Sequence, residues 1–188
     1  MRRFISPLVF GLAATLLIMP ASSAQAPNDR KPPVIADQQA SGGIDTVMAY
    51  AGTWKVTGER FATAHSDAGK EDTTLRNDCW KSGGYVACNQ YVNGESKVLL
   101  VFTYSDLTKM YTSYPIPKDG QAVGSGRLQI VGNVWTFPWE STDGGVTTFF
   151  HVVNVFKDHD HIEYAQEFSP DNVHWTKMAQ GSEVRIAN

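Results

Sequence analysis

The fold class of this chain is decided by residues 85–104, which read YVACNQYVNGESKVLLVFTY. Two runs rich in β-branched and aromatic residues, Tyr85–Val92 and Lys97–Tyr104, lie on either side of the dipeptide Asn93-Gly94. Asn-Gly favours the type I′ turn of a tight hairpin, because both central residues of that turn need a positive φ. The stretch therefore predicts two antiparallel strands joined by a short turn.

Runs of the same kind, separated by turn signals, continue on both sides of this hairpin. The further predicted strands are Thr53–Phe61, Thr73–Lys81, Lys109–Tyr114, Gly124–Val131, Val134–Trp139, Thr147–Phe156, His161–Phe168 and Val173–Ile186. Only Ile44–Ala51 has the pattern of a short helix. About ten sequential strands with short connections predict an all-β, up-and-down meander, and such a meander hides its edges best by closing into an antiparallel barrel.

The N-terminal residues have the pattern of a secretory signal peptide. Arg2 and Arg3 precede a mostly apolar run, and the small residues 21–24 favour cleavage after Ala24. The apolar run is too short to span a bilayer core of roughly 30 Å, which argues against a membrane anchor. We therefore predict a signal peptide over 1–24, a Pro-containing flexible linker over 25–43 and a barrel domain over 44–188, in a periplasmic or secreted protein.

The charge of the chain disfavours two classes of partner. The chain has 16 Lys and Arg against 19 Asp and Glu, and removal of residues 1–24 changes the net charge from −3 to −5. Nucleic acids and anionic membrane surfaces both require a basic face. We expect neither partner, and the sequence does not indicate an oligomeric state.

Cys79 and Cys88 are the two cysteines of the chain. Export places them in an oxidising compartment, which favours a disulfide, and two free buried thiols are the alternative.

Side-chain alternation along each strand sorts residues between the two faces of the sheet. Pairing Val92 with Glu95 across the Asn-Gly turn predicts that the inner face carries Ala87, Asn89, Tyr91, Val98, Leu100 and Phe102. Placing Cys79 opposite Cys88 adds Arg76, Asp78 and Trp80 to that face. It also leaves both cysteines, Gln90, Lys81 and Lys97 on the solvent face.

Two downstream turns are treated in the same way. A turn at Gly132-Asn133 aligns Leu128 and Ile130 with Trp135 and Phe137. A turn around Asp158-His159 aligns Phe149, His151 and Val153 with Tyr164, Gln166 and Phe168, and leaves His161, Glu163 and Glu167 outside. The predicted ligand-binding residues are Arg76, Asp78, Trp80, Asn89, Tyr91, Phe102, Tyr111, Trp135, Phe137, Phe149, His151, Tyr164 and Gln166.

An aromatic cavity with a few convergent polar groups is typical of a small-molecule site. The first functional hypothesis is therefore a barrel that binds an apolar or amphipathic molecule. The second is a cofactor-free acid/base enzyme of isomerase or hydratase type, with His151 and Asp78 as the weak catalytic candidates. The third is a structural envelope domain without a ligand.

The segment Ile44–Trp54, which ends in Gly52-Thr53-Trp54, resembles the opening of lipocalin-like (calycin) barrels. The resemblance implies that Trp54 lies at the closed end of the barrel, covered by an Arg of the last strand, for which Arg185 is the candidate. More narrowly, Trp80–Gly84 and Glu167–Trp175 resemble hairpins of a bacterial secreted domain family of this fold. That family implies a fold and no particular activity.

Metal and haem sites are weighed from the histidines. His159 and His161 flank Asp160, but no third ligand is fixed by the sequence, so a solvated turn is the preferred interpretation. Some related barrels bind haem through a late His such as His174, but residues 55–58 do not fit the start of those relatives. We predict neither a metal nor a cofactor.

Overall fold

A computed structural model describes residues 42–120 and 124–187. The predicted signal peptide 1–24 and all but the last two residues of the predicted linker lie outside the described residues. The elements are the 3-10 helix η1 (Ile44–Tyr50) and the strands β1 (Gly52–Arg60), β2 (Gly69–Ser82), β3 (Tyr85–Val92), β4 (Glu95–Ser105), β5 (Met110–Pro117), β6 (Gly126–Val131), β7 (Val134–Asp143), β8 (Val146–Phe156), β9 (His161–Ser169) and β10 (Thr176–Ala187).

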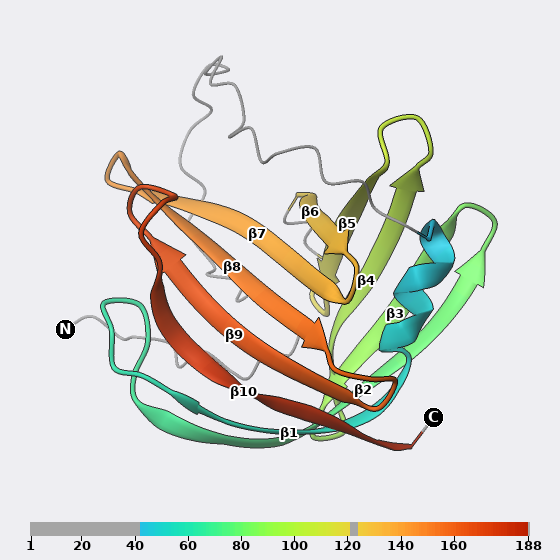
Figure 1. The fold of residues 1–188 in the computed structure, drawn as a ribbon, viewed down its shortest axis with the longest axis horizontal. Helices are drawn as coiled ribbons and strands as arrows, with labels where there is room; N and C mark the ends of the chain where they lie inside the picture. Colours follow the sequence, from blue (N-terminus) through green and yellow to red (C-terminus); the bar gives the residue numbers. More distant parts are fainter. Residues whose placement is uncertain (1–41, 121–123, 188) are drawn as a thin grey trace.

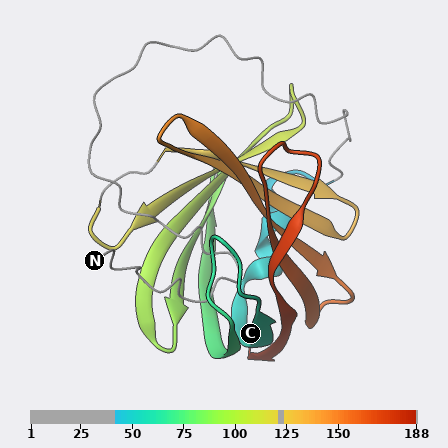
Figure 2. The same ribbon diagram turned by 90° about the vertical axis from the view of Figure 1, so that its left-hand side faces the viewer.

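The ten strands form one closed antiparallel barrel (Figure 1). Each strand pairs with its neighbour in the sequence, and β10 returns to pair with β1. The view in Figure 2 shows the strands curving around a common interior, with η1 at one end. The predicted all-β, up-and-down closed barrel is thus confirmed, and closure leaves no strand without a partner on either side.

The predicted boundaries agree at β3 and differ by a few residues at other strands, since β2 begins at Gly69 instead of Thr73 and β7 ends at Asp143 instead of Trp139. Strand β3 has the predicted ends, whereas β10 begins at Thr176 instead of Val173. The difference arises because the Asp171 carboxylate accepts hydrogen bonds from the backbone N–H groups of Val173 and His174, at 2.9 and 2.8 Å. This side chain holds the segment as a turn, the usual effect of an Asp that bonds the backbone two or three residues later.

Cys79 and Cys88 form the predicted disulfide and lie opposite each other on β2 and β3. The predicted solvent exposure of the pair is wrong, because Cys88 belongs to the buried core and Cys79 packs against that core.

The part of the chain that the structure describes contains no helix of the length and apolar character needed to cross a bilayer.

Candidate functional site

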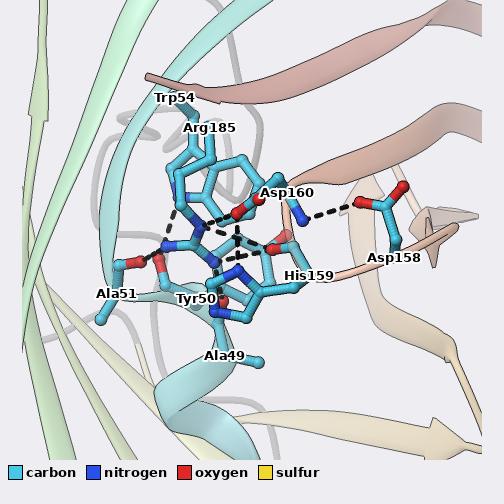
Figure 3. Close-up of polar contacts among 8 residues, drawn as sticks. All are labelled: Ala49, Tyr50, Ala51, Trp54, Asp158, His159, Asp160 and Arg185. Atoms are coloured by element: carbon cyan, nitrogen blue, oxygen red, sulfur yellow. Dashed lines mark hydrogen bonds and ion pairs between the residues drawn. The ribbon is translucent and has the colours of Figure 1, made fainter. Parts of the chain in front are cut away.

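Arg185 lies at the end of the barrel that carries η1, where it contacts residues of several elements (Figure 3). Its guanidinium carbon lies 4.0 Å from the centre of the Trp54 ring. Its nitrogens donate to the backbone oxygens of Ala49 at 2.9 Å and His159 at 3.0 Å, and also to the backbone oxygen of Ala51. Trp54 and Arg185 are therefore in contact, as the resemblance to calycin barrels implies, and the contact ties β1, β10, η1 and the β8–β9 turn together.

Tyr50, the last residue of η1, begins the aromatic lining of the interior. Its ring centre lies 5.2 Å from that of Trp135, 5.6 Å from that of Phe156 and 6.4 Å from that of Phe137. The Tyr50 carbonyl accepts a hydrogen bond from the Trp54 indole at 3.1 Å. Tyr50, Trp135, Phe137 and Phe156 thus form an aromatic plug that closes this end of the barrel. The polar atoms of Tyr50 have hydrogen-bond partners, as buried polar groups require.

A polar cluster lies above this plug in the buried interior. Glu71 accepts a hydrogen bond from the Tyr164 hydroxyl, and its other oxygen lies 3.9 Å from the Arg60 Nε. Glu183 is fully buried, since its cross-strand neighbours Val56 and Ile162 belong to the core. Two carboxyl groups are therefore enclosed within a largely apolar wall.

Burial controls the protonation of this cluster. It raises the pKa of Glu183 to about 8, and the charge of Glu71 contributes to the rise. Burial and Glu71 together hold the pKa of the Tyr164 hydroxyl well above its usual value. Burial and Glu183 do the same to the pKa of Tyr50. Removing charges from water favours the neutral form of an acid, so Glu183, Tyr164 and Tyr50 favour their neutral forms at neutral pH.

The loop between β1 and β2 brings a second aromatic group to the opposite end of the barrel. The ring of His65 contacts Phe168 and Phe150, with centre separations of 4.5 and 5.3 Å. Trp139 stacks on Phe150 at 5.3 Å. Burial lowers the pKa of His65, so this ring favours its neutral form. Aromatic rings therefore line the interior from its sealed end to the β1–β2 loop.

The predicted ligand-binding residues divide between the two faces. Those on the inner face are Phe102, Tyr111, Trp135, Phe137, Tyr164 and Gln166. Those on the outer face are Arg76, Asp78, Trp80, Asn89, Tyr91, Phe149 and His151. The predicted inward orientation is wrong for the residues on the outer face. That residues of either group contact a ligand stays a prediction.

A β-bulge explains the wrong orientation that was predicted for the residues of β2 and β3. Val92 pairs with Glu95 as expected, but the register shifts next to Tyr91, and Gln90 pairs with Val98 instead of with Lys97. Because β4 has one extra residue at the bulge, the residues of β3 that a regular hairpin would place on the inner face lie on the outer face. Gln90 therefore points inward. Because β2 follows the register of β3, the predicted residues of β2 also move to the outer face.

A longer turn between β8 and β9 explains the wrong orientation that was predicted for the residues of β8. A turn centred on Asp158 and His159 pairs Phe156 with His161, whereas the structure pairs Phe156 with Ile162. The Lys157 N–H instead bonds the carbonyl of His161 at 2.8 Å. The shift by one residue keeps the β9 residues inside and places the odd-numbered residues of β8 outside.

His151, the weak catalytic candidate, belongs to a small cluster on the outer surface. Its Nε2 lies 2.8 Å from a Glu167 carboxylate oxygen, and its ring stacks on Trp175 at 3.7 Å. The other candidate, Asp78, forms an exposed ion pair with Arg76 at 3.2 Å. The structure does not bring His151 and Asp78 together, so the enzyme hypothesis loses the dyad on which it was built.

His159 and His174 lie in exposed turns, and His161 is the first residue of β9. His159 contacts Asp160 at 2.6 Å, and His174 contacts Asp171 at 2.7 Å. Within residues 42–120 and 124–187, no group of three or more His, Cys, Asp or Glu side chains is arranged to hold a metal ion.

Sequence reasoning missed the interior residues Glu71, Glu183, Tyr50 and Asn154. A signal for Glu183 was present, because an inward Arg185 places the residue two positions earlier on the same face of β10. Glu71 follows by alternation from Leu75, which pairs with Trp54. The register error at the β8–β9 turn hid Asn154, because it assigned the even positions of β8 to the outside.

The molecule also has a groove of about 880 Å³ along β1, β8, β9 and β10. Most of its lining residues occupy outward positions, and they include the charged Lys70, Glu163 and Lys177. The groove therefore lies mainly on the outer face, and it borders the interior at Arg60 and Tyr164.

Models of known protein families do not match the chain, and a search of curated proteins returns no relative. The class that the fold defines is a closed ten-stranded antiparallel barrel, consistent with a lipocalin-like architecture, with aromatic clusters in its interior.

Proposed function

We propose that this chain is an exported small-molecule-binding barrel that holds an apolar or amphipathic ligand against its aromatic inner wall. The observation that carries the proposal is the composition of that wall. Aromatic rings surround a few polar side chains that converge in the interior, the combination typical of small-molecule sites. A periplasmic or extracellular location is part of the proposal, and the Cys79–Cys88 disulfide supports it.

Binding is favoured over the two alternatives for different reasons. The acid/base hypothesis needs a catalytic pair inside the barrel, and both of its candidate residues occupy outward positions. A purely structural domain is not expected to contain buried carboxyl groups, because burying a carboxyl costs free energy whereas burying an apolar side chain does not.

The test is a fluorescence titration with N-phenyl-1-naphthylamine, an uncharged apolar probe. A matched pair of variants locates the site, since Val152 points inward and its neighbour Val153 points outward. We expect saturable binding to the wild type, a loss of roughly tenfold or more in affinity for Val152→Phe, and little change for Val153→Phe. Circular dichroism checks that both variants fold. Equal effects of the two substitutions, or no saturable binding, would contradict the proposal.

A further inference from the structure

Several hydrogen-bond acceptors in the interior have no donor. Both carboxyl oxygens of Glu183 lack a hydrogen-bond partner among the residues that the structure describes, and its side chain is 0% exposed. The amide oxygen of Asn154 and the hydroxyl oxygen of Thr73 are likewise buried without a partner in the described ranges. Buried polar atoms in native proteins are bonded in the great majority of cases, so each of these atoms calls for an explanation.

The unfilled acceptors belong to alternate strands of the barrel wall, Thr73 to β2, Glu183 to β10 and Asn154 to β8. Val56 pairs with Glu183 on one side and with Thr73 on the other. Asn154 donates its own N–H to the hydroxyl of Tyr50, whose phenol interacts electrostatically with Glu183. Tyr50 thus links Glu183 with Asn154, whereas Thr73 lies across the Val56 strand from Glu183, and all three acceptor side chains are buried.

Two donors near the cluster contact the other acid. The Tyr164 hydroxyl and the Arg60 guanidinium both contact Glu71, and neither bonds Glu183. The Glu183 carboxyl is therefore buried without a hydrogen-bond partner among the described residues, which is unfavourable in either protonation state.

We infer that this acceptor cluster is the binding site for the positively charged head of an amphipathic primary amine, an inference that rests on the proposed function. An ammonium group carries three N–H donors and one positive charge, so it can donate to three of the four unfilled oxygens and pair with Glu183 once that carboxyl has lost its proton. The apolar body of the amine lies against the Trp135 and Phe137 side of the wall. An ionised fatty acid or phosphate head has few or no hydrogens to donate, so it cannot fill these acceptors.

A divalent metal fits the cluster less well. Calcium takes six to eight oxygen ligands and magnesium takes six, and both usually bind several carboxylates or waters. Over the described part of the chain, no set of three or more His, Cys, Asp or Glu residues could hold such an ion.

The experiment compares three ligands that share one alkyl chain: decylamine, decanol and decanoic acid. Each displaces N-phenyl-1-naphthylamine from the wild type at pH 7, below its aggregation concentration. We expect decylamine to act at a concentration at least about tenfold lower than decanol, and decanoic acid to be the weakest. Thermal unfolding with each ligand provides a second readout that does not need the probe.

Two interior variants and one surface variant locate the effect. Glu183→Gln removes the preference for the amine, so that decylamine and decanol act at similar concentrations, and Thr73→Val weakens the amine severalfold. Glu163→Gln, on the outer face of β9, retains the preference. If the amine and the alcohol bind and stabilise equally, or if Glu183→Gln keeps the preference, the inference fails while the binding function stands. If none of the three ligands binds or stabilises the protein, both fail.

The pH dependence of binding gives a further check. Proton loss from Glu183, whose pKa burial raises to about 8, must accompany entry of an ammonium group. Glu71, Tyr50 and Tyr164 are the other titratable groups that interact with it, and Arg60 lies beside Glu71. We expect the affinity for decylamine to rise between pH 6 and pH 9 in the wild type and to stay flat in Glu183→Gln.

Discussion

Two arginines of this barrel stack on aromatic rings at nearly the same distance but in different surroundings. Arg185 lies 4.0 Å from Trp54, and its side chain is 7% exposed. Arg76 lies 4.1 Å from Tyr91 on the outer face, and its side chain is 48% exposed. Cation–π contacts are worth more when water is excluded, and Arg185 also bonds several backbone carbonyls.

We therefore predict that Arg185→Ala lowers the free energy of unfolding by about 2–4 kcal/mol, whereas Arg76→Ala lowers it by less than about 1 kcal/mol. Urea denaturation followed by tryptophan fluorescence measures both values. Similar losses for the two variants would show that the sealed end does not depend on Arg185.

Glu183 makes the stability of the barrel depend on pH. Its folded pKa of about 8 lies above the value of about 4.5 expected for an unfolded chain. Between these two values the folded state holds a proton that the unfolded state has lost, so stability falls as the pH rises from about 5 to about 8. The full effect is on the order of a few kcal/mol.

Glu183→Gln cannot lose a proton, so we predict that it is more stable than the wild type at pH 9 and that most of the decline disappears. Denaturation at pH 5, 7 and 9 provides the measurement, and the exposed Glu163→Gln serves as the control that retains the decline. A wild type with the same stability at pH 5 and pH 9 would argue against a buried neutral carboxyl.

At the scale of elements, the strands were predictable, but the faces of β2, β3 and β8 were predicted wrongly. Turn chemistry such as Asn93-Gly94 marks where a strand ends, which is why β3 was predicted with correct bounds. The face of each residue depends on single-residue events, namely the bulge beside Tyr91 and the extra residue in the β8–β9 turn. Neither event has a local signature in the sequence, and each reverses the orientation of a whole strand.

The disulfide links two strands that are already paired, and we predict that it still contributes to stability. The double variant Cys79→Ala/Cys88→Ala loses roughly 2–3 kcal/mol, because the bond restricts the unfolded chain over a short loop. Denaturation of the wild type with and without a reducing agent is the companion measurement, and the reduced protein should match the double variant. No change on reduction would mean that the disulfide is not formed or does not restrict the unfolded chain.

At the scale of the whole molecule, closure follows from sequential pairing. Ten neighbouring strands with short turns return the chain to its start, where β10 pairs with β1. This outcome was predictable because an open meander would expose two edges. The polar part of the interior was not predictable in full, since Glu71 and Asn154 become neighbours of Glu183 only after the barrel closes with its particular register.

The outer surface of the barrel carries exposed apolar side chains to which apolar molecules can adsorb. Trp80, Tyr85, Tyr114 and Ile116 are exposed on the outer face of β2, β3 and β5. Adsorption to such a face is distinguished from binding in the interior by its stoichiometry, because the barrel encloses one interior whereas a surface takes up molecules without a fixed number.

The central claim is that the aromatic interior binds one small molecule, and native mass spectrometry of the purified chain titrated with decanol tests it most directly. We predict a single added ligand mass that saturates at one per chain, that persists in Trp80→Ala and that weakens in Val152→Phe. Graded addition of several ligands, loss of binding in Trp80→Ala, or no addition at any concentration would contradict the claim.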